Sequence, residues 1–198
     1  MVSEIGSAIV EKTQSLVSGN VPEEEHILRQ SQADPEAFRP VYEKYYKKLF
    51  LFILHRTGER ETTADLTQQV FMKALTSLRK FEFRGLPFSA WLYRIAINEC
   101  NDYFRKTKRA RLVVLEETSE ELFYEELTAG NSSEELHTKL PAILQQLAPD
   151  HLQIIELRFF EGRSFKEVSE ILGITENHAK VKTYRILKKM KKLFLLIP

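Results

Sequence analysis

Two stretches of the 198-residue sequence combine positive charge with residue types that suit nucleic-acid binding. In the C-terminal stretch, seven of the thirteen residues from Lys180 to Lys192 are basic. On a helix, the outward side chains of this stretch are those of Lys180, Lys182, Tyr184, Arg185, Lys188 and Lys189. A helix of this kind brings its first turns to base edges in the major groove and its later cations to phosphates. The alternative is a solvated lysine face, which is the usual role of a run of charges.

The second stretch, "FEFRGLPFSAWLYRIAINECNDYFRKTKR", interleaves aromatic rings with cations. Rings on which bases stack, with cations that neutralise the backbone, suit single-stranded nucleic acid. Asparagine amides can hydrogen-bond a base that has left the stack. The candidate residues are Trp91, Tyr93, Arg94, Asn98, Asn101, Arg105, Lys106 and Lys108. Large rings at helical spacing are also typical of a core, and this alternative is strongest for Phe88 and Trp91.

The C-terminal basic stretch forms the second half of a predicted helix-turn-helix. Ser164 and Glu167 have the spacing of a capping box, Gly173 permits the tight turn, and Thr175 is a candidate N-cap. Apolar residues on both helices can hold the pair together: Val168, Ile171, Leu172, Ile174, Ala179, Ile186 and either Val181 or Thr183.

The rest of the chain also reads as helical, with no strand pattern of any length. Helices are expected between Pro35 and Arg56, after Thr62 and Thr63, from Pro87, over residues 133–147 and over residues 149–160. The stretch Leu112–Leu136 holds eight glutamates and no Lys or Arg, which indicates an exposed linker. We therefore expect an all-α protein with an N-terminal extension (1–25), a helical domain (26–111), an acidic flexible linker (112–133) and a helix-turn-helix domain (134–198).

Several classes of protein are disfavoured by composition. The formal net charge is only +1, and Cys100 is the single cysteine, so no internal disulfide or multi-thiolate metal site is expected. No apolar run approaches the roughly 20 residues of a membrane span, and the N-terminus does not resemble a secretory signal, so we expect a cytoplasmic protein. No phosphate-binding glycine loop or metal-binding carboxylate cluster suggests an enzyme, a cofactor or a small-molecule substrate.

Four segments, in this order, carry a resemblance to a known family. They are "DPEAFRPVYEKYYKKLFLFI", "DLTQQVFMKAL", "FSAWLYRIAINECNDYFRKTKR" and "LAPDHLQIIELRFFEGRSFKEVSEILGIT". Over about residues 34–111 and 134–194 the chain resembles a bacterial sigma factor of the extracytoplasmic-function group of the sigma-70 family, the minimal kind with regions 2 and 4 only. One such motif is weak, but four in the same order are specific.

The resemblance implies a function for each segment. Asp65, Leu66, Gln68, Gln69 and Phe71 fall in the helix that docks on the β′ clamp of core RNA polymerase, and the β flap is the second expected contact. Asn98 matches a position associated with a flipped base of the minus-10 element. The residues expected at the minus-35 element are Thr175, His178, Lys180, Lys182, Tyr184, Arg185 and Lys188. The acidic linker is expected to thread the polymerase channels, and an anti-sigma factor is the expected regulator.

The expected function is therefore a sigma subunit that binds core polymerase, recognises duplex and single-stranded promoter DNA and melts it. Two departures from the family pattern concern promoter preference and regulation. Asn177, His178 and Ala179 replace a common Gly-Thr-Val run, and about 25 residues precede the usual start. The alternative is a stand-alone helix-turn-helix regulator, which would not need the "DLTQQVF" helix or the aromatic, basic segment.

Overall fold

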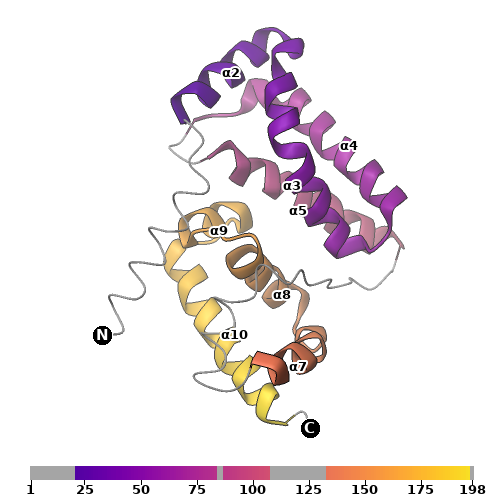
Figure 1. The fold of residues 1–198 in the computed structure, drawn as a ribbon. Coiled ribbons are helices and arrows are strands. Elements are labelled where there is room, and N and C mark those ends of the chain that lie inside the picture. The colour runs from indigo at the N-terminus through magenta and orange to yellow at the C-terminus, as the bar shows by residue number, and fades with distance from the viewer. Residues whose placement is uncertain (1–20, 84–86, 108–132, 197–198) are drawn as a thin grey trace. The chain divides into compact units, whose positions relative to one another are not determined.

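The computed structural model describes residues 21–83, 87–107 and 133–196, and all regular structure in these ranges is helical (Figure 1). The chain divides into two compact units, residues 1–110 and 111–198. The prediction of an all-α protein with two helical domains is confirmed. Most of the acidic segment lies outside the described residues. No helix in the described ranges is both long enough and apolar enough to cross a bilayer.

The first unit, over its described residues, contains four α-helices and two short 3-10 helices. They are α2 (Val21–Ala33), η1 (Pro35–Phe38), α3 (Arg39–Thr57), α4 (Arg60–Ser77), η2 (Leu78–Lys80) and α5 (Phe88–Thr107). Residues 21–25, expected in the N-terminal extension, form the first turns of α2. Helix α4 begins at Arg60, slightly ahead of the start expected at Thr62 and Thr63.

The core of this unit lies between α3, α4 and α5, which run alongside one another (Figure 1). Its fully buried side chains include those of Leu49, Ile53, Val70, Ala74, Leu92 and Ala96. Burial of each leucine or isoleucine side chain stabilises the fold by about 1.5–3 kcal/mol. At the end of α3, Gly58 adopts a left-handed conformation with φ 67° and donates to the carbonyl of Leu54. A glycine accepts this conformation without a Cβ penalty, so the chain can turn back into α4.

Polar contacts tie the helices of the first unit together. The buried Glu24 carboxylate of α2 accepts hydrogen bonds from the Tyr45 hydroxyl (2.6 Å) and from Lys44 Nζ (2.9 Å) of α3. The buried Glu99 carboxylate of α5 accepts from Lys73 Nζ of α4 at 2.6 Å. A buried carboxylate without a partner is costly, so these pairs favour one arrangement of the helices.

The second unit contains α7 (Ser133–Gln145), α8 (Pro149–Ile155), the π-helical segment η4 (Glu156–Phe160), α9 (Phe165–Leu172) and α10 (Glu176–Leu196). Its hydrophobic core joins α7, α8 and the inner face of α10. Leu140, Ile143, Leu144, Ile155 and Met190 are fully buried there. This unit therefore has a core of its own.

The local signals of the helix-turn-helix are present as predicted. Ser164 Oγ accepts from the Glu167 N–H (3.2 Å), and the Glu167 carboxylate accepts from the Ser164 N–H (2.9 Å), which completes the capping box. Gly173 ends α9 with φ 66°. Thr175 Oγ1 accepts from the His178 N–H at 3.2 Å and caps α10. These contacts satisfy backbone groups that a helix leaves unpaired at its ends.

Candidate nucleic-acid and polymerase interfaces

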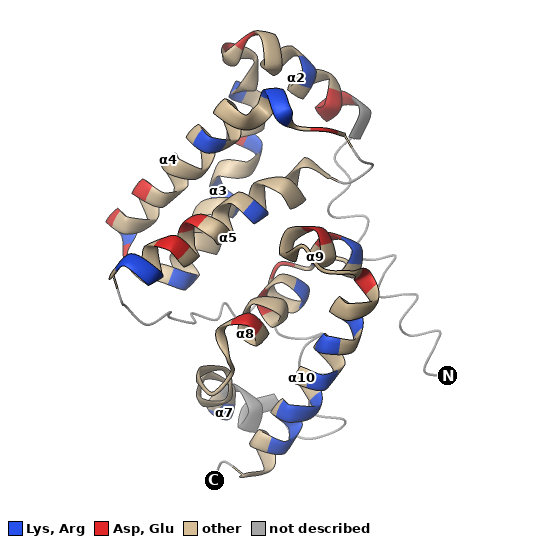
Figure 2. Cartoon of the chain, turned by 180° about the vertical axis from the view of Figure 1, so that it is seen from behind, with Lys and Arg blue, Asp and Glu red and all other residues tan. Residues whose placement is uncertain are grey.

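Helix α10 has one buried and one basic, exposed face. Ala179, Thr183, Ile186, Leu187 and Met190 are buried against the rest of the second unit. Figure 2 shows Lys and Arg residues recurring along α10. Six of the seven residues expected at the minus-35 element are exposed: Thr175, His178, Lys180, Tyr184, Arg185 and Lys188. This face can contact both bases and phosphates of a duplex.

The seventh residue, Lys182, is only half-exposed because it is paired within the unit. Its Nζ lies 2.7 Å from Asp150 Oδ2, in the first turn of α8. The Lys182 hydrogen bond holds the pKa of the Asp150 carboxyl below its usual value, against the opposing effect of burial. Lys180 pairs with Glu176 on the same helix at 2.8 Å.

The inward-facing residue between Ala179 and Ile186 is Thr183, not Val181. Thr183 is buried and its hydroxyl donates to the Ala179 carbonyl at 2.8 Å, which satisfies the polar group within the helix. Val181 is 40% exposed. The sequence left both residues open because threonine and valine have similar size and shape. On a helix the two positions point about 200° apart, and Thr183 shares the buried face with Ala179 and Ile186.

Phe165, at the start of α9, is a candidate contact that the sequence did not single out. Its ring lies 6.4 Å from that of Tyr184. The Arg158 guanidinium lies 4.7 Å from the Phe165 ring centroid, and Lys180 Nζ lies 5.9 Å from it. This cluster links α9 and η4 to the exposed face of α10. The signal in the sequence was the aromatic residue directly after the N-cap Ser164.

Helix α5 carries a stripe of exposed polar residues. Arg94, Asn98, Asn101 and Arg105 follow one another at steps of four, three and four, so they share one face, and all four are exposed. Trp91 lies one step earlier on this face and is half-buried, with its ring 4.9 Å from Phe81 and 5.3 Å from Phe88. Arg105 pairs with Asp102 at 2.9 Å. Lys106 is exposed, and Lys108 lies outside the described residues.

Tyr93 does not belong to this exposed stripe of α5. Its side chain is 1% exposed, and its ring lies 4.7 Å from that of Phe52 in the core. Phe88 is also buried, as the core interpretation expected. Tyr93 directly precedes Arg94, and neighbouring residues point about 100° apart on a helix. The interpretation of Tyr93 as an exposed platform for bases is therefore replaced by a role in the core.

The residues expected to bind polymerase divide between the two faces of α4. Asp65, Gln68 and Gln69 are exposed, whereas Leu66 and Phe71 are each only 5% exposed and pack in the core. The exposed residues of α4 can contact a partner directly, and the two buried ones hold the helix in place.

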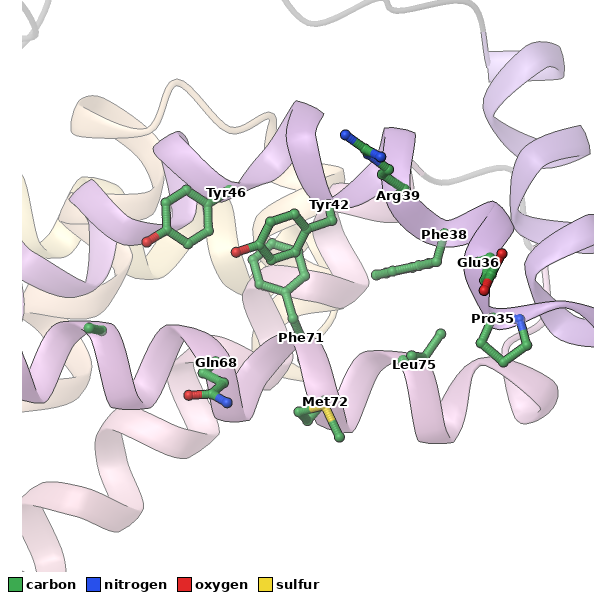
Figure 3. A pocket seen from close by; sticks show the side chains of 11 residues that line it. Pro35, Glu36, Phe38, Arg39, Tyr42, Tyr46, Gln68, Phe71, Met72 and Leu75 are labelled. Carbon is green, nitrogen blue, oxygen red and sulfur yellow. The ribbon is translucent and has the colours of Figure 1, made fainter.

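A pocket of about 870 Å³ lies beside this exposed face, between α4 and the η1–α3 segment (Figure 3). Tyr42, Tyr46 and Phe71 contribute aromatic rings, with Tyr42 and Phe71 centroids 4.7 Å apart. Tyr42, Tyr46 and Met72 are 41%, 36% and 55% exposed, so the lining includes apolar surface that the fold leaves uncovered. Partial burial raises the pKa of the Tyr42 phenol, and the neighbouring Tyr46 adds to this shift. Exposed apolar surface of this kind commonly marks an interaction site.

Comparisons with known proteins agree with both units. Residues 41–110 match the family Sigma-70 region 2, and residues 143–192 match Sigma-70, region 4. The chain is 30% identical over 147 residues to the RNA polymerase sigma factor SigV of Bacillus subtilis, with 74% of this chain and 82% of the relative covered. It is 31% identical over 173 residues to the ECF RNA polymerase sigma factor BldN of Streptomyces coelicolor, and spans 64% of the length of that relative.

Two solved structures share the fold. One is CnrH in complex with the cytosolic domain of CnrY, with a TM-score of 0.59 and 19% identity, covering 87% of this chain and 97% of the other. The second is the sigma factor RpoE in complex with the anti-sigma factor NepR from Bartonella quintana, with a TM-score of 0.57 and 20% identity, covering 81% and 98%. With the helical units and the sequence matches, these findings place the chain in the extracytoplasmic-function group of sigma-70 family RNA polymerase sigma factors.

Proposed function

We propose that this chain is a sigma subunit that binds core RNA polymerase, recognises a bipartite promoter and opens it. The observation that supports the proposal is that two differently built polar surfaces, each with residue types that suit nucleic acid, lie on separate units of one family member. The α10 face is cationic and suits a duplex. The α5 stripe offers two amides between arginines, which suits bases that have left the stack.

The α10 face is the proposed contact with the minus-35 element. Helix α9 crosses the backbone while α10 enters the major groove, as in other helix-turn-helix proteins. The exposed cations would bind phosphates, so affinity should fall steeply with salt.

The α5 stripe is the proposed contact with the minus-10 element. Asn98 lies at its centre, flanked one turn away by Arg94 and Asn101, and the family resemblance associates Asn98 with a flipped base. Half-buried rings of Trp91, Tyr103 and Phe104 lie on or beside this part of α5 and offer stacking surfaces in place of Tyr93. Each stacking contact contributes about 1–3 kcal/mol, so a few of them offset the several kcal/mol that base-pair opening costs.

Melting is then a matter of differential binding. The α10 face gains free energy from the closed duplex, whereas the α5 stripe gains it only when bases are unpaired, so the open state is favoured once both are engaged. No covalent step is involved, and the chain acts in the cytoplasm with the polymerase and the chromosome.

The exposed face of α4, with the adjacent pocket, is the proposed contact with the β′ clamp. Gln68, Asp65 and Gln69 supply polar contacts beside apolar surface from Met72 and the two tyrosines. The second unit is proposed to contact the β flap. The acidic segment between the units would run through the polymerase channels, where its glutamates would mimic a nucleic-acid backbone.

An anti-sigma factor is the proposed regulator. The RpoE structure named above was solved in complex with an anti-sigma factor. The uncovered pocket beside α4 offers one surface where such a partner could compete with polymerase.

The proposal is tested by mixing the purified chain with bacterial core RNA polymerase. Co-elution in size exclusion, followed by promoter-specific transcripts from a pool of genomic fragments, is the expected result. Binding to DNA without association with the polymerase would favour a stand-alone helix-turn-helix regulator instead.

A further inference from the structure

The outermost line of residues on α10 begins with two uncharged side chains. Because successive residues turn by about 100°, the positions opposite the buried face recur at steps of three and four. Asn177, Val181 and Arg185 occupy them at exact steps of four residues, and Lys188 and Lys192 continue the line. All five are exposed.

Two cations beside the first turns of this line are engaged within the protein. Lys180 is paired with Glu176 at 2.8 Å, and Lys182 with Asp150 at 2.7 Å. In contrast, no hydrogen bond or ion pair engages the side chain of Asn177 or Arg185 among residues 133–196. Asn177 and Arg185 are therefore among the exposed side chains of α10 that are free to meet base edges.

Val181 lies outside the hydrophobic core cluster of the second unit. Its 40% exposure places an apolar side chain between an amide and a guanidinium on a basic surface. Folding gains little from an apolar residue in this position, whereas the methyl group of thymine in the major groove offers it an apolar contact.

We propose that Asn177 and Val181 are specificity-determining residues of the upstream promoter element, with Asn177 reading an adenine and Val181 a thymine methyl group. This inference rests on the proposed function, since it assumes that α10 enters the major groove. Asparagine forms a bidentate pair with adenine N6 and N7, and arginine forms one with guanine O6 and N7. Arg185 then adds a guanine contact one turn further along.

The spacing of the helix predicts the spacing of these bases. Four residues rise by about 6 Å along α10. Base pairs rise by about 3.4 Å along each strand. The adenine and the thymine should therefore lie about two base pairs apart, within the part of the element nearest the N-terminus of α10.

The experiment uses holoenzyme assembled from the full chain and core polymerase. A promoter library randomised over the upstream element gives the preferred sequence. In that sequence, deoxyuridine replaces each thymine, which removes only the methyl group, and a purine without the N6 amino group replaces each adenine. Replacement should lower wild-type binding by about three- to tenfold at one thymine and at one adenine, and these two bases should lie two base pairs apart.

Two variants assign these effects to residues. Val181→Ser, which puts a polar hydroxyl in place of the apolar side chain, should abolish the response to deoxyuridine at the one thymine, and Asn177→Ala the response at the one adenine. Lys192→Ala is the matched control at the far end of the same line: it should weaken binding to all sequences alike and keep both responses. Circular dichroism checks that the exposed substitutions leave the helix intact.

The outcomes distinguish a wrong assignment of Asn177 and Val181 from a wrong proposed function. An enriched element whose binding responds to neither analogue, or responses that persist in Val181→Ser and Asn177→Ala, would refute the assignment of these residues and leave the sigma function standing. Failure of the holoenzyme to form, or to select any sequence, would refute the proposed function and this inference together.

Discussion

Lys182 of α10 donates from its Nζ to Asp150 Oδ2 of α8 at 2.7 Å, so one cation of the proposed DNA-binding face is held by a carboxylate of its own unit. The pair joins the first turn of α8 to the second turn of α10. It also places a negative charge beside a surface that would approach phosphates. Helix α10 is therefore less cationic in effect than its sequence implies.

Replacing the carboxylate should strengthen duplex binding. Asp150→Asn frees Lys182 for a phosphate and removes a repulsive charge, so affinity at low salt should rise several-fold and the slope of log K against log salt should steepen by about one. Fluorescence anisotropy with a labelled promoter duplex measures both quantities. Glu43→Gln, on α3 of the first unit, changes net charge equally and serves as the control. Equal behaviour of the two variants would contradict a local effect of Asp150.

The same pair predicts a small dependence of stability on acid. The pKa of Asp150 is lower in the folded state than its ordinary value of 3.8 because of Lys182. The pair therefore stabilises the fold fully above the unfolded-state pKa, and this contribution is lost as pH falls through the folded-state pKa. Both side chains are partly solvated, so it should be on the order of 0.5 kcal/mol. Urea unfolding of wild type and Asp150→Asn at pH 6 should show this difference, and their curves should converge in acid. A difference that stays constant with pH would exclude the ion pair as its source.

Asn98→Ala should weaken promoter opening without weakening upstream binding. The residue is exposed, so the variant should keep the wild-type free energy of unfolding, while open-complex formation should fall about tenfold through loss of one hydrogen-bonded base contact. Permanganate footprinting reports opening, and DNase footprinting reports upstream protection. Gln30→Ala, exposed on α2, is the control. Equal loss of both signals in Asn98→Ala would refute the division of labour between the units.

Tyr93→Ala should act through stability instead. Removing a fully buried ring leaves a cavity and should lower the free energy of unfolding by about 3–5 kcal/mol. Tyr93→Phe keeps the ring and should cost about 1 kcal/mol, with promoter opening near that of wild type. Thermal unfolding and permanganate footprinting on both variants test this. Normal stability together with lost opening in Tyr93→Phe would return Tyr93 to a direct role in melting.

Met72→Glu should weaken association with core polymerase. The side chain is 55% exposed at the edge of the α4 pocket, so a charge there should leave the fold intact and disrupt an apolar contact. We expect at least about a tenfold loss of affinity for core polymerase, typical of a charge placed at a buried contact. Biolayer interferometry with immobilised core measures it. Lys80→Glu, exposed on η2, is the control, and equal affinities for the two variants would argue against this surface as the docking site.

Features of the fold and of the candidate sites could be predicted from the sequence where they are determined by residues close together in the chain. The capping box of Ser164 and Glu167, the turn at Gly173 and the start of α5 after Pro87 are set by neighbouring residues, and the sequence predicted them. Arg94, Asn98, Asn101 and Arg105 were predicted as candidate residues, but the prediction did not separate them from Tyr93. The burial of Tyr93 could not be predicted, because it depends on which neighbour, here Phe52 of α3, lies across the core.

Contacts between distant residues were the part that sequence could not supply. The Lys182–Asp150 pair joins positions 32 residues apart, and the α4 pocket forms where α3 and α4 meet. Tyr42 and Tyr46 fit the apolar repeat of α3, yet they lie at the edge of the buried face of α3, where α4 covers them only in part.

The separation of buried and exposed faces on α10 has a consequence for how such proteins diverge. The buried face packs α10 against the rest of the unit through Ala179, Thr183, Ile186 and Met190. Positions 177, 181 and 185 are exposed, and substitutions at such positions usually change the free energy of unfolding by less than about 0.5 kcal/mol. After gene duplication, a daughter copy could thus acquire a new set of target genes through a few nearly neutral mutations. Its fold and its proposed association with core RNA polymerase would be inherited unchanged.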